Sequence, residues 1–134
     1  EDLARQYGIE SDVRFLGKQE QMEDILAVSD LFLLPSEYES FGLVALEAMA
    51  SSVAVISSNA GGLGEINIDG KTGFTADVGD VATMSKRAIE LLKDDAQLKA
   101  FKHNALEQAK LFDIHHIIPI YENLYRRFCR TGDC

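Results

Sequence analysis

The chain has 134 residues, of which 46% are hydrophobic and 26% charged, which is the size and composition of one globular domain. Its formal net charge of -9 argues against nucleic acid and anionic membrane surfaces as partners, and no apolar run is long enough for a membrane span. Two cysteines are too few for a disulfide framework, so a cytoplasmic location is expected.

The first part of the chain predicts a helix end, a strand and a short helix. Residues 2–8 have helix-forming composition, and Gly8 stands in the position that closes such a helix. The stretch 13–17 alternates and is rich in β-forming residues, so it predicts a strand. Apolar residues at helical spacing between 20 and 28 predict a short amphipathic helix.

The central part predicts a strand, a loop and a helix. Residues 31–34 are all apolar and are stopped by Pro35, which is typical of a buried strand. A polar loop follows at 36–40, and a run of good helix formers begins near Leu43. The loop therefore lies where the carboxyl end of a strand meets the amino end of a helix, and ligands of open α/β sheets bind at such places.

This junction combines backbone amides with two carboxylates. The amides of residues 41–44 are expected to be unpaired donors of the first helical turn, and Gly42 lets an anion approach the backbone. Glu39 and Glu47 bracket the site and are suited to accept hydrogen bonds from sugar hydroxyls. A structural explanation is equally open, since Ser36-x-x-Glu39 fits a capping box and Glu47 fits a solvated helix residue.

After the central helix, residues 53–56 form another apolar run and predict a second buried strand. The glycine-rich loop 57–64 lacks the third glycine of a dinucleotide-binding fingerprint. It predicts instead a tight turn that lets backbone approach the central helix. Residues 69–73 predict a further turn, followed by a short strand at 74–76.

Helices are expected from Asp80 onward. Asp80 is a suitable N-cap, a second helix begins near Asp95, and a third spans 113–130. Pro119 either kinks this last helix or marks the point where it starts again. Strands that come first with helices between them predict a Rossmann-like, doubly wound parallel sheet in an α/β domain that ends in a run of helices.

Residues 39–48, ESFGLVALEA, resemble the E-x7-E motif of the family-4 retaining glycosyltransferases, which have the two-domain GT-B fold. The likeness extends from VRFLG at 13–17 to AGGLGEI and DGKTGF. Within the family, the chain most resembles the N-acetylglucosaminyl L-malate synthases. The resemblance implies that residues 1–134 are one nucleotide-sugar-binding domain, the partial C-terminal domain of a hexosyltransferase.

The resemblance also implies roles for particular residues. Glu39 would be the catalytic residue and contact the donor sugar, and Glu47 would bind the ribose. The donor sugar and diphosphate would also meet Ser40, Phe41, Gly42, Leu43 and Val44, and the base would meet Arg14, Phe15 and Leu16. The donor would be a UDP-sugar such as UDP-N-acetylglucosamine, the acceptor L-malate, and neither a metal nor another cofactor would be needed.

The same resemblance implies that an N-terminal acceptor domain and basic residues lie upstream of Glu1, so this chain alone is expected to be inactive. Three positions depart from the family pattern: Ser52 and Gly64 replace a usual glycine and a usual proline, and Ala54 replaces another proline. These departures concern the shapes of loops. A non-catalytic α/β module that binds a nucleotide or phosphate at the same helix end is the alternative function.

The last predicted helix carries a wide apolar stripe between Ile114 and Phe128. In GT-B enzymes the last helix packs on the N-terminal domain, so part of this stripe is expected to lack a partner here. An exposed apolar patch tends to find another surface. The stripe therefore predicts a homodimer of this chain through residues 114–128.

Overall fold

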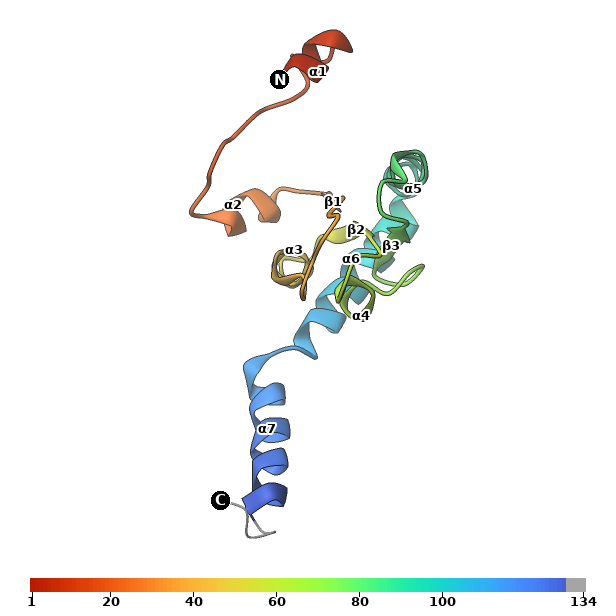
Figure 1. Cartoon of the computed structure of the whole chain (residues 1–134). Coiled ribbons are helices and arrows are strands. Elements are labelled where there is room, and N and C mark those ends of the chain that lie inside the picture. Colours follow the sequence, from red (N-terminus) through yellow and green to blue (C-terminus); the bar gives the residue numbers. More distant parts are fainter. Residues whose placement is uncertain (130–134) are drawn as a thin grey trace.

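The computed structural model describes residues 1–129, which form a three-stranded parallel sheet flanked by helices (Figure 1). The strands run in the order β1 (Leu31–Leu34), β2 (Ala54–Ser58) and β3 (Gly73–Ala76). Ile56 in β2 is aligned with Leu33 on one side and Phe74 on the other. The helices are α1 (Asp2–Gln6), α2 (Met22–Ala27), α3 (Leu43–Ala50), α4 (Leu63–Ile66), α5 (Val81–Lys93), α6 (Asp95–Lys110) and α7 (Ile114–Cys129).

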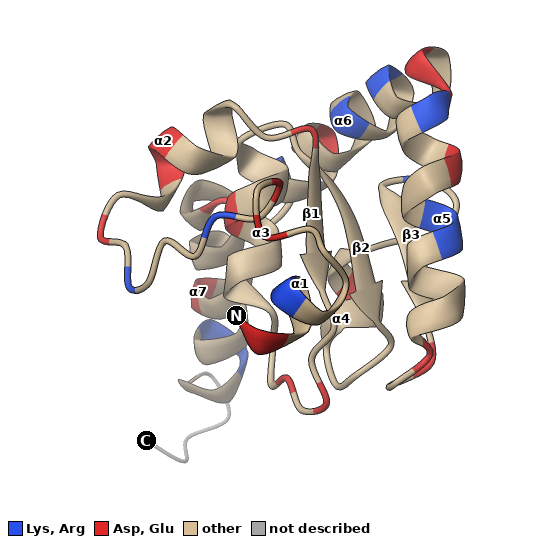
Figure 2. Ribbon diagram, turned by 90° about the horizontal axis from the view of Figure 1, so that it is seen from above, with Lys and Arg blue, Asp and Glu red and all other residues tan. Residues whose placement is uncertain are grey.

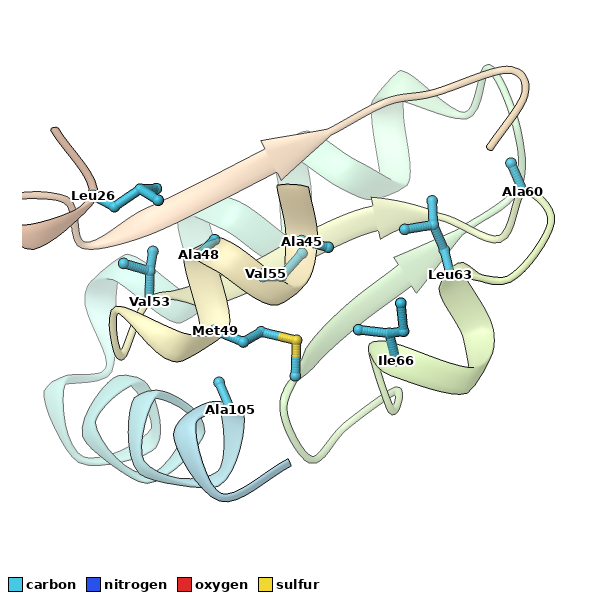
Figure 3. Packing of buried hydrophobic residues seen from close by; sticks show 10 residues of the cluster. All are labelled: Leu26, Ala45, Ala48, Met49, Val53, Val55, Ala60, Leu63, Ile66 and Ala105. Carbon is cyan, nitrogen blue, oxygen red and sulfur yellow. The ribbon is translucent and has the colours of Figure 1, made fainter. Parts of the chain in front are cut away.

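Strand β2 is the centre of the core because helices cover both of its faces. Val53 and Val55 contribute to a cluster with side chains of α2, α3, α4 and α6 (Figure 3). The alternate residues Ala54 and Ile56 belong to a second cluster with α5 and the first half of α6. Every residue of β2 is buried, which is why its sequence is an unbroken apolar run that ends in Ser57 and Ser58. The predicted doubly wound α/β sheet is confirmed.

Two strand predictions fare less well. β1 forms as predicted, but it is an edge strand and Leu33 is 52% exposed, so it is only partly buried. The strand predicted at 13–17 is wrong: this segment is irregular and mostly exposed, and it pairs with no strand among the described residues. A strand needs a hydrogen-bonded neighbour, and composition alone does not supply one.

The predicted helix boundaries are largely confirmed. Gly8 closes α1 with a φ of 66°, and the Asp80 carboxylate accepts a hydrogen bond from the Thr83 amide at 3.0 Å. α7 runs unbroken from Ile114, so the alternative in which the helix starts again at Pro119 is wrong. Residue 130, the last of the predicted span, lies outside the described residues.

Ser52, where the family pattern has a glycine, adopts the left-handed conformation that a glycine would favour, with a φ of 58°. The Ser52 amide donates to the Met49 carbonyl and the Val53 amide to the Ala48 carbonyl, both at 3.0 Å. These two bonds are the Schellman ending of a helix. The departure at Ser52 therefore leaves the shape of the α3–β2 connection intact, at a cost in backbone strain.

Helix α7 extends away from the sheet (Figure 1). None of its residues is buried, and Tyr121 and Leu124 remain 57% and 47% exposed. The apolar stripe predicted for this helix is therefore largely open to solvent. Whether a second copy covers it stays a prediction.

Candidate functional site

The candidate site lies at the carboxyl edge of the sheet, where residues 36–42, the site loop, connect β1 to α3. Gly42 is the N-cap of α3 and has a φ of 95°, a left-handed conformation that suits glycine. A Cβ at Gly42 would lie 2.6 Å from the Leu63 Cδ2 atom, so the backbone here is also pressed against α4. The predicted order of strand, loop and helix is confirmed, and both reasons for a glycine are visible.

The start of α3 presents backbone donors. The helix begins at Leu43, and among residues 1–129 the amides of Leu43 and Val44 make no hydrogen bond. The Gly42 amide differs from the expectation, because it donates to the Glu39 Oε1 atom at 3.1 Å. Phe41 and Ser40 precede the helix. The unpaired pair at Leu43 and Val44 is thus the donor set that the helix start offers to an anion.

The capping-box explanation is wrong. No side chain caps α3 in this way, because the helix begins at Leu43, well beyond the spacing that Ser36 and Glu39 would require. Ser36 instead uses its carbonyl, which accepts a hydrogen bond from the Ser58 hydroxyl at 2.5 Å. Glu39 nevertheless has a structural contact of its own in the bond from Gly42.

Glu47 is exposed on α3 and lines two cavities of about 330 and 340 Å³. The first lies between α3 and the end of α6, and its wall includes Phe112 and Lys110. The second lies between α3 and α2, and Glu20 and Met22 line it. Neither of these two cavities includes Glu39 or residues 14–16. The structure therefore brings Glu47 close to α2 and α6, and neither of these two cavities joins it to Glu39.

Residues 14–16, predicted to hold the base, lie in the irregular segment before α2. Phe15 and Leu16 are 57% and 52% exposed. Figure 1 shows this segment apart from the sheet. Of the predicted site residues, those at 39–44 are thus assembled at the start of α3, whereas those at 14–16 are not brought to it.

An aromatic contact that sequence reasoning missed links the site to α6. The Phe41 and Phe112 rings pack edge to face, with centroids 5.9 Å apart and an interplanar angle of 71°. Phe112 lies in the connection between α6 and α7. Its place at the end of the apolar stripe of α6 indicates a packing residue, but nothing in the sequence indicates its partner.

The glycine loop makes the close approach that was predicted for it, although the neighbour is the site loop rather than α3 itself. A Cβ at Gly61 would lie 1.6 Å from the Glu39 carbonyl oxygen. At Gly62 it would lie 2.9 Å from the Ser40 carbonyl oxygen. The backbones of the glycine loop and the site loop are therefore in direct contact, with no room for a side chain at Gly61 or Gly62.

The charge at the site is negative. The site loop and α3 contain no Lys or Arg, and Glu47 is the only charged residue of α3, whereas α5 and α6 carry several Lys and Arg residues (Figure 2). Among residues 1–129, no three His, Cys, Asp or Glu side chains are placed to hold a metal ion. Nor does any described helix combine the length and apolarity needed to cross a membrane.

A parallel sheet with helices on both faces, with donors at the start of a helix on its carboxyl edge, defines a Rossmann-like domain. Residues 1–108 match the family described as "Glycosyl transferases group 1". The chain belongs to this family.

Two curated relatives illustrate the match. The chain is 43% identical over 124 residues to the N-acetyl-alpha-D-glucosaminyl L-malate synthase of Bacillus anthracis, which covers 92% of this chain and 32% of that protein. It is 38% identical over 133 residues to a D-inositol 3-phosphate glycosyltransferase of Corynebacterium kroppenstedtii, covering 95% of this chain and 30% of that protein. The chain thus spans about a third of the length of these relatives.

Solved structures share the fold. Sucrose-phosphate synthase of Thermosynechococcus elongatus is 30% identical with a TM-score of 0.86, over 98% of this chain and 34% of that chain. The Anabaena protein HepE, in complex with UDP, is 27% identical with a TM-score of 0.86, over 93% and 35%. The C-terminal domain of a group 1 glycosyl transferase of Francisella tularensis is 25% identical with a TM-score of 0.75, over 84% and 60%. The predicted GT-B relationship is confirmed.

Proposed function

We propose that this chain is the donor-binding domain of a retaining glycosyltransferase that transfers a hexosyl group from a UDP-sugar. The observation that carries the proposal is the start of α3, where the free amides of Leu43 and Val44 follow Gly42 and stand between Glu39 and Glu47 on the chain. Amides and the helix dipole suit a diphosphate, and carboxylates suit the hydroxyls of the two sugars that flank it. The UDP complex of HepE supports this choice of ligand.

In the transfer step, the bond between the anomeric carbon and the diphosphate oxygen breaks as a bond from the acceptor hydroxyl oxygen to the same carbon forms. Negative charge grows on the departing UDP, which takes up the hydroxyl proton. The Leu43 and Val44 amides stabilise that charge because they are fixed in place before the reaction. Glu39, in the middle of the site loop that precedes α3, accepts hydrogen bonds from the donor-sugar hydroxyls and holds the anomeric carbon in position. Ser40 and Phe41 complete the contacts on the sugar side, and no metal or other cofactor takes part.

Glu47 binds the ribose in this proposal. It lies one helical turn beyond Leu43, so a ligand that extends from the helix start along α3 reaches it. The base lies against Arg14, Phe15 and Leu16. The cavity between α2 and α3, which Glu47 lines together with Glu20 and Met22, does not include these three residues, so their assignment rests on the resemblance of the sequence to the family.

The donor is UDP-N-acetylglucosamine and the acceptor L-malate, a choice supported by the 43% identity to the Bacillus anthracis synthase. In this proposal, the acceptor domain and the basic residues that neutralise the diphosphate belong to another part of the protein, and the coverage of 32% of the synthase supports that division. The lack of Lys and Arg in the site loop and α3 agrees with this division. The proposal includes a cytoplasmic location.

Titration calorimetry of the 134-residue chain tests the proposal, with UDP, UDP-N-acetylglucosamine, ATP and inorganic phosphate as ligands. UDP is expected to bind weakly, because part of the neutralising charge is missing, yet more tightly than ATP or phosphate. Glu47→Gln is expected to weaken UDP binding, and Glu90→Gln on α5 is the matched control. Equal affinity for UDP, ATP and phosphate would contradict a sugar-nucleotide site and favour the non-catalytic phosphate-binding module. A micromolar or tighter constant for UDP would show that the chain holds a more complete site.

A further inference from the structure

The site loop is held along its length by residues 58–63, the loop seat, which connect β2 to α4. At the start of the loop, the Ser58 hydroxyl donates to the Ser36 carbonyl at 2.5 Å. Ser58 is 1% exposed, so the donor of this bond is shielded from water, whereas Ser36 is half-buried. At the other end, Leu63 lies under Gly42, where a Cβ would come within 2.6 Å of the Leu63 Cδ2 atom.

Two glycines make the middle of the seat. A Cβ at Gly61 would lie 1.6 Å from the Glu39 carbonyl oxygen, and Gly61 has a φ of 52°. A Cβ at Gly62 would lie 2.9 Å from the Ser40 carbonyl oxygen and 3.2 Å from the Phe41 Cα atom. The loop seat and the site loop therefore run side by side from Ser58 and Ser36 to Leu63 and Gly42. Any side chain on the two glycines would displace the loop.

The seat is itself anchored in the core. Asn67, at the end of α4, is 1% exposed and donates to the Val55 and Phe74 carbonyls of two strands, at 3.2 and 3.0 Å. Its side chain also accepts a hydrogen bond from the buried Thr72 hydroxyl at 2.9 Å. Leu63 and Ile66 of α4 are fully buried in the cluster around Val55 (Figure 3). Displacement of the loop seat would break these hydrogen bonds. A clash between the two segments is therefore expected to displace the site loop instead.

We propose that Ser58, Gly61 and Gly62 are positioning residues for donor binding. They act through the site loop: the seat fixes the carbonyls of Ser36, Glu39 and Ser40, and this sets where the Glu39 carboxylate and the Leu43 and Val44 amides point. The inference rests on the proposed function for its consequence, which is an effect on the diphosphate contact. The placement of the loop itself is independent of any ligand.

Gly62→Ala tests the inference, and Gly64→Ala is the matched control. Both are single methyl additions at positions without a positive φ, but a Cβ at Gly64 meets nothing within 4 Å. In the chain without ligand, Gly62→Ala is expected to shift the amide resonances of Gly42, Leu43 and Val44, and Gly64→Ala is not. UDP affinity, measured by resonance titration, is expected to fall about tenfold in Gly62→Ala, which corresponds to the loss of one well-placed hydrogen bond.

Uridine separates positioning from a general loss of structure. Because uridine lacks the diphosphate, its affinity is expected to be the same in Gly62→Ala and the wild type. Equal losses for UDP and uridine, or unchanged UDP affinity in a folded Gly62→Ala, would overturn the inference. If Gly62→Ala does not fold, Ser58→Ala replaces it as the test, because this variant removes one hydrogen bond without adding atoms. A ratio of UDP affinity to uridine affinity equal to that of the wild type would then overturn the inference. If the wild type binds no UDP, the proposed function fails, and the amide shifts alone decide whether the seat positions the loop.

Discussion

Substitution of Glu39 separates a structural from a chemical role for this carboxylate. Its Oε1 atom accepts a hydrogen bond from the Gly42 amide at 3.1 Å, and the side chain is partly buried. Glu39→Gln keeps an acceptor oxygen of the same reach but removes the charge. Glu39→Ala removes both. The two variants therefore differ in the contact with Gly42, whereas both lose the charged acceptor that the donor sugar is proposed to use.

The magnitudes follow from that contact. A hydrogen bond to a charged group contributes about 1.5–3 kcal/mol and a neutral one about 0.5–1.5 kcal/mol. Glu39→Gln is thus expected to lower the free energy of unfolding by about 1 kcal/mol, and Glu39→Ala by about 2 kcal/mol. If the carboxylate also holds the donor sugar in the transition state, both variants lose a further 1.5–3 kcal/mol there, or about tenfold to hundredfold in turnover.

Urea unfolding of the chain measures the first effect, and steady-state rates of the complete enzyme with the donor varied measure the second. Glu90→Gln is the control, because Glu90 is an exposed carboxylate of α5 that contacts Lys86 and Arg87 rather than the site. If the turnover of the variants instead decreases only in proportion to their stability, with Glu39→Gln close to the wild type, Glu39 is a purely structural residue.

Four further predictions concern α3, the ends of two helices and α7. Glu47→Gln should raise the KM for the donor about tenfold with little change in kcat, because the ribose is bound equally in ground and transition states; a pure kcat effect would contradict this. Ser52→Gly should raise the free energy of unfolding by about 0.5–1 kcal/mol in urea, since it relieves a φ of 58°, and a loss of stability would be the opposite result. Hydrogen bonds from the hydroxyl and amide of Thr83 lower the pKa of Asp80, so the stability that this carboxylate adds is present above its ordinary pKa and is lost as the pH falls below about 4. Asp80→Asn, which still caps the helix, should make the free energy of unfolding less dependent on pH below about 4, and an unchanged pH dependence would disprove this. Light scattering at rising concentration should show self-association that Tyr121→Glu abolishes, whereas a strict monomer at all concentrations would exclude pairing through α7.

Local signals account for the parts of the fold that were predicted correctly. The apolar run at 53–56 indicates a strand buried on both faces, and β2 is such a strand, with α3 and α5 on opposite sides. Asp80 as an N-cap and Gly8 as a helix end are likewise decided within a few residues of the chain. These features depend on residues that are close together in the sequence, so the sequence alone is sufficient to predict them.

The incorrect strand predictions and the unforeseen contacts at the site depend on segments that are distant in the sequence. The stretch 13–17 has the composition of a strand but no neighbour to pair with among the described residues, and the edge position of β1 was equally invisible. At the site, the motif indicates where the carboxylates and amides lie along the chain. The bond from Gly42 to Glu39 and the contact of Phe41 with Phe112 depend on how the loop folds back, which no local pattern specifies.

The prediction for Gly61 and Gly62 was partly correct. Gly61 and Gly62 indicate that two backbones approach each other, and that much was predicted. Which backbone they approach depends on the packing of α4 under the site loop, which rests on Leu63 and on the buried amide of Asn67. A buried asparagine that joins two strands and a helix has no signature in a single sequence.

The position of bound diphosphate decides whether the start of α3 is the donor site. A crystal structure of the chain grown with saturating UDP is expected to place diphosphate oxygens within hydrogen-bonding distance of the Leu43 and Val44 amide nitrogens, and the ribose hydroxyls on the Glu47 carboxylate. A diphosphate bound elsewhere on the chain, with the Leu43 and Val44 amides still unpaired, would show that the start of α3 is not the donor site.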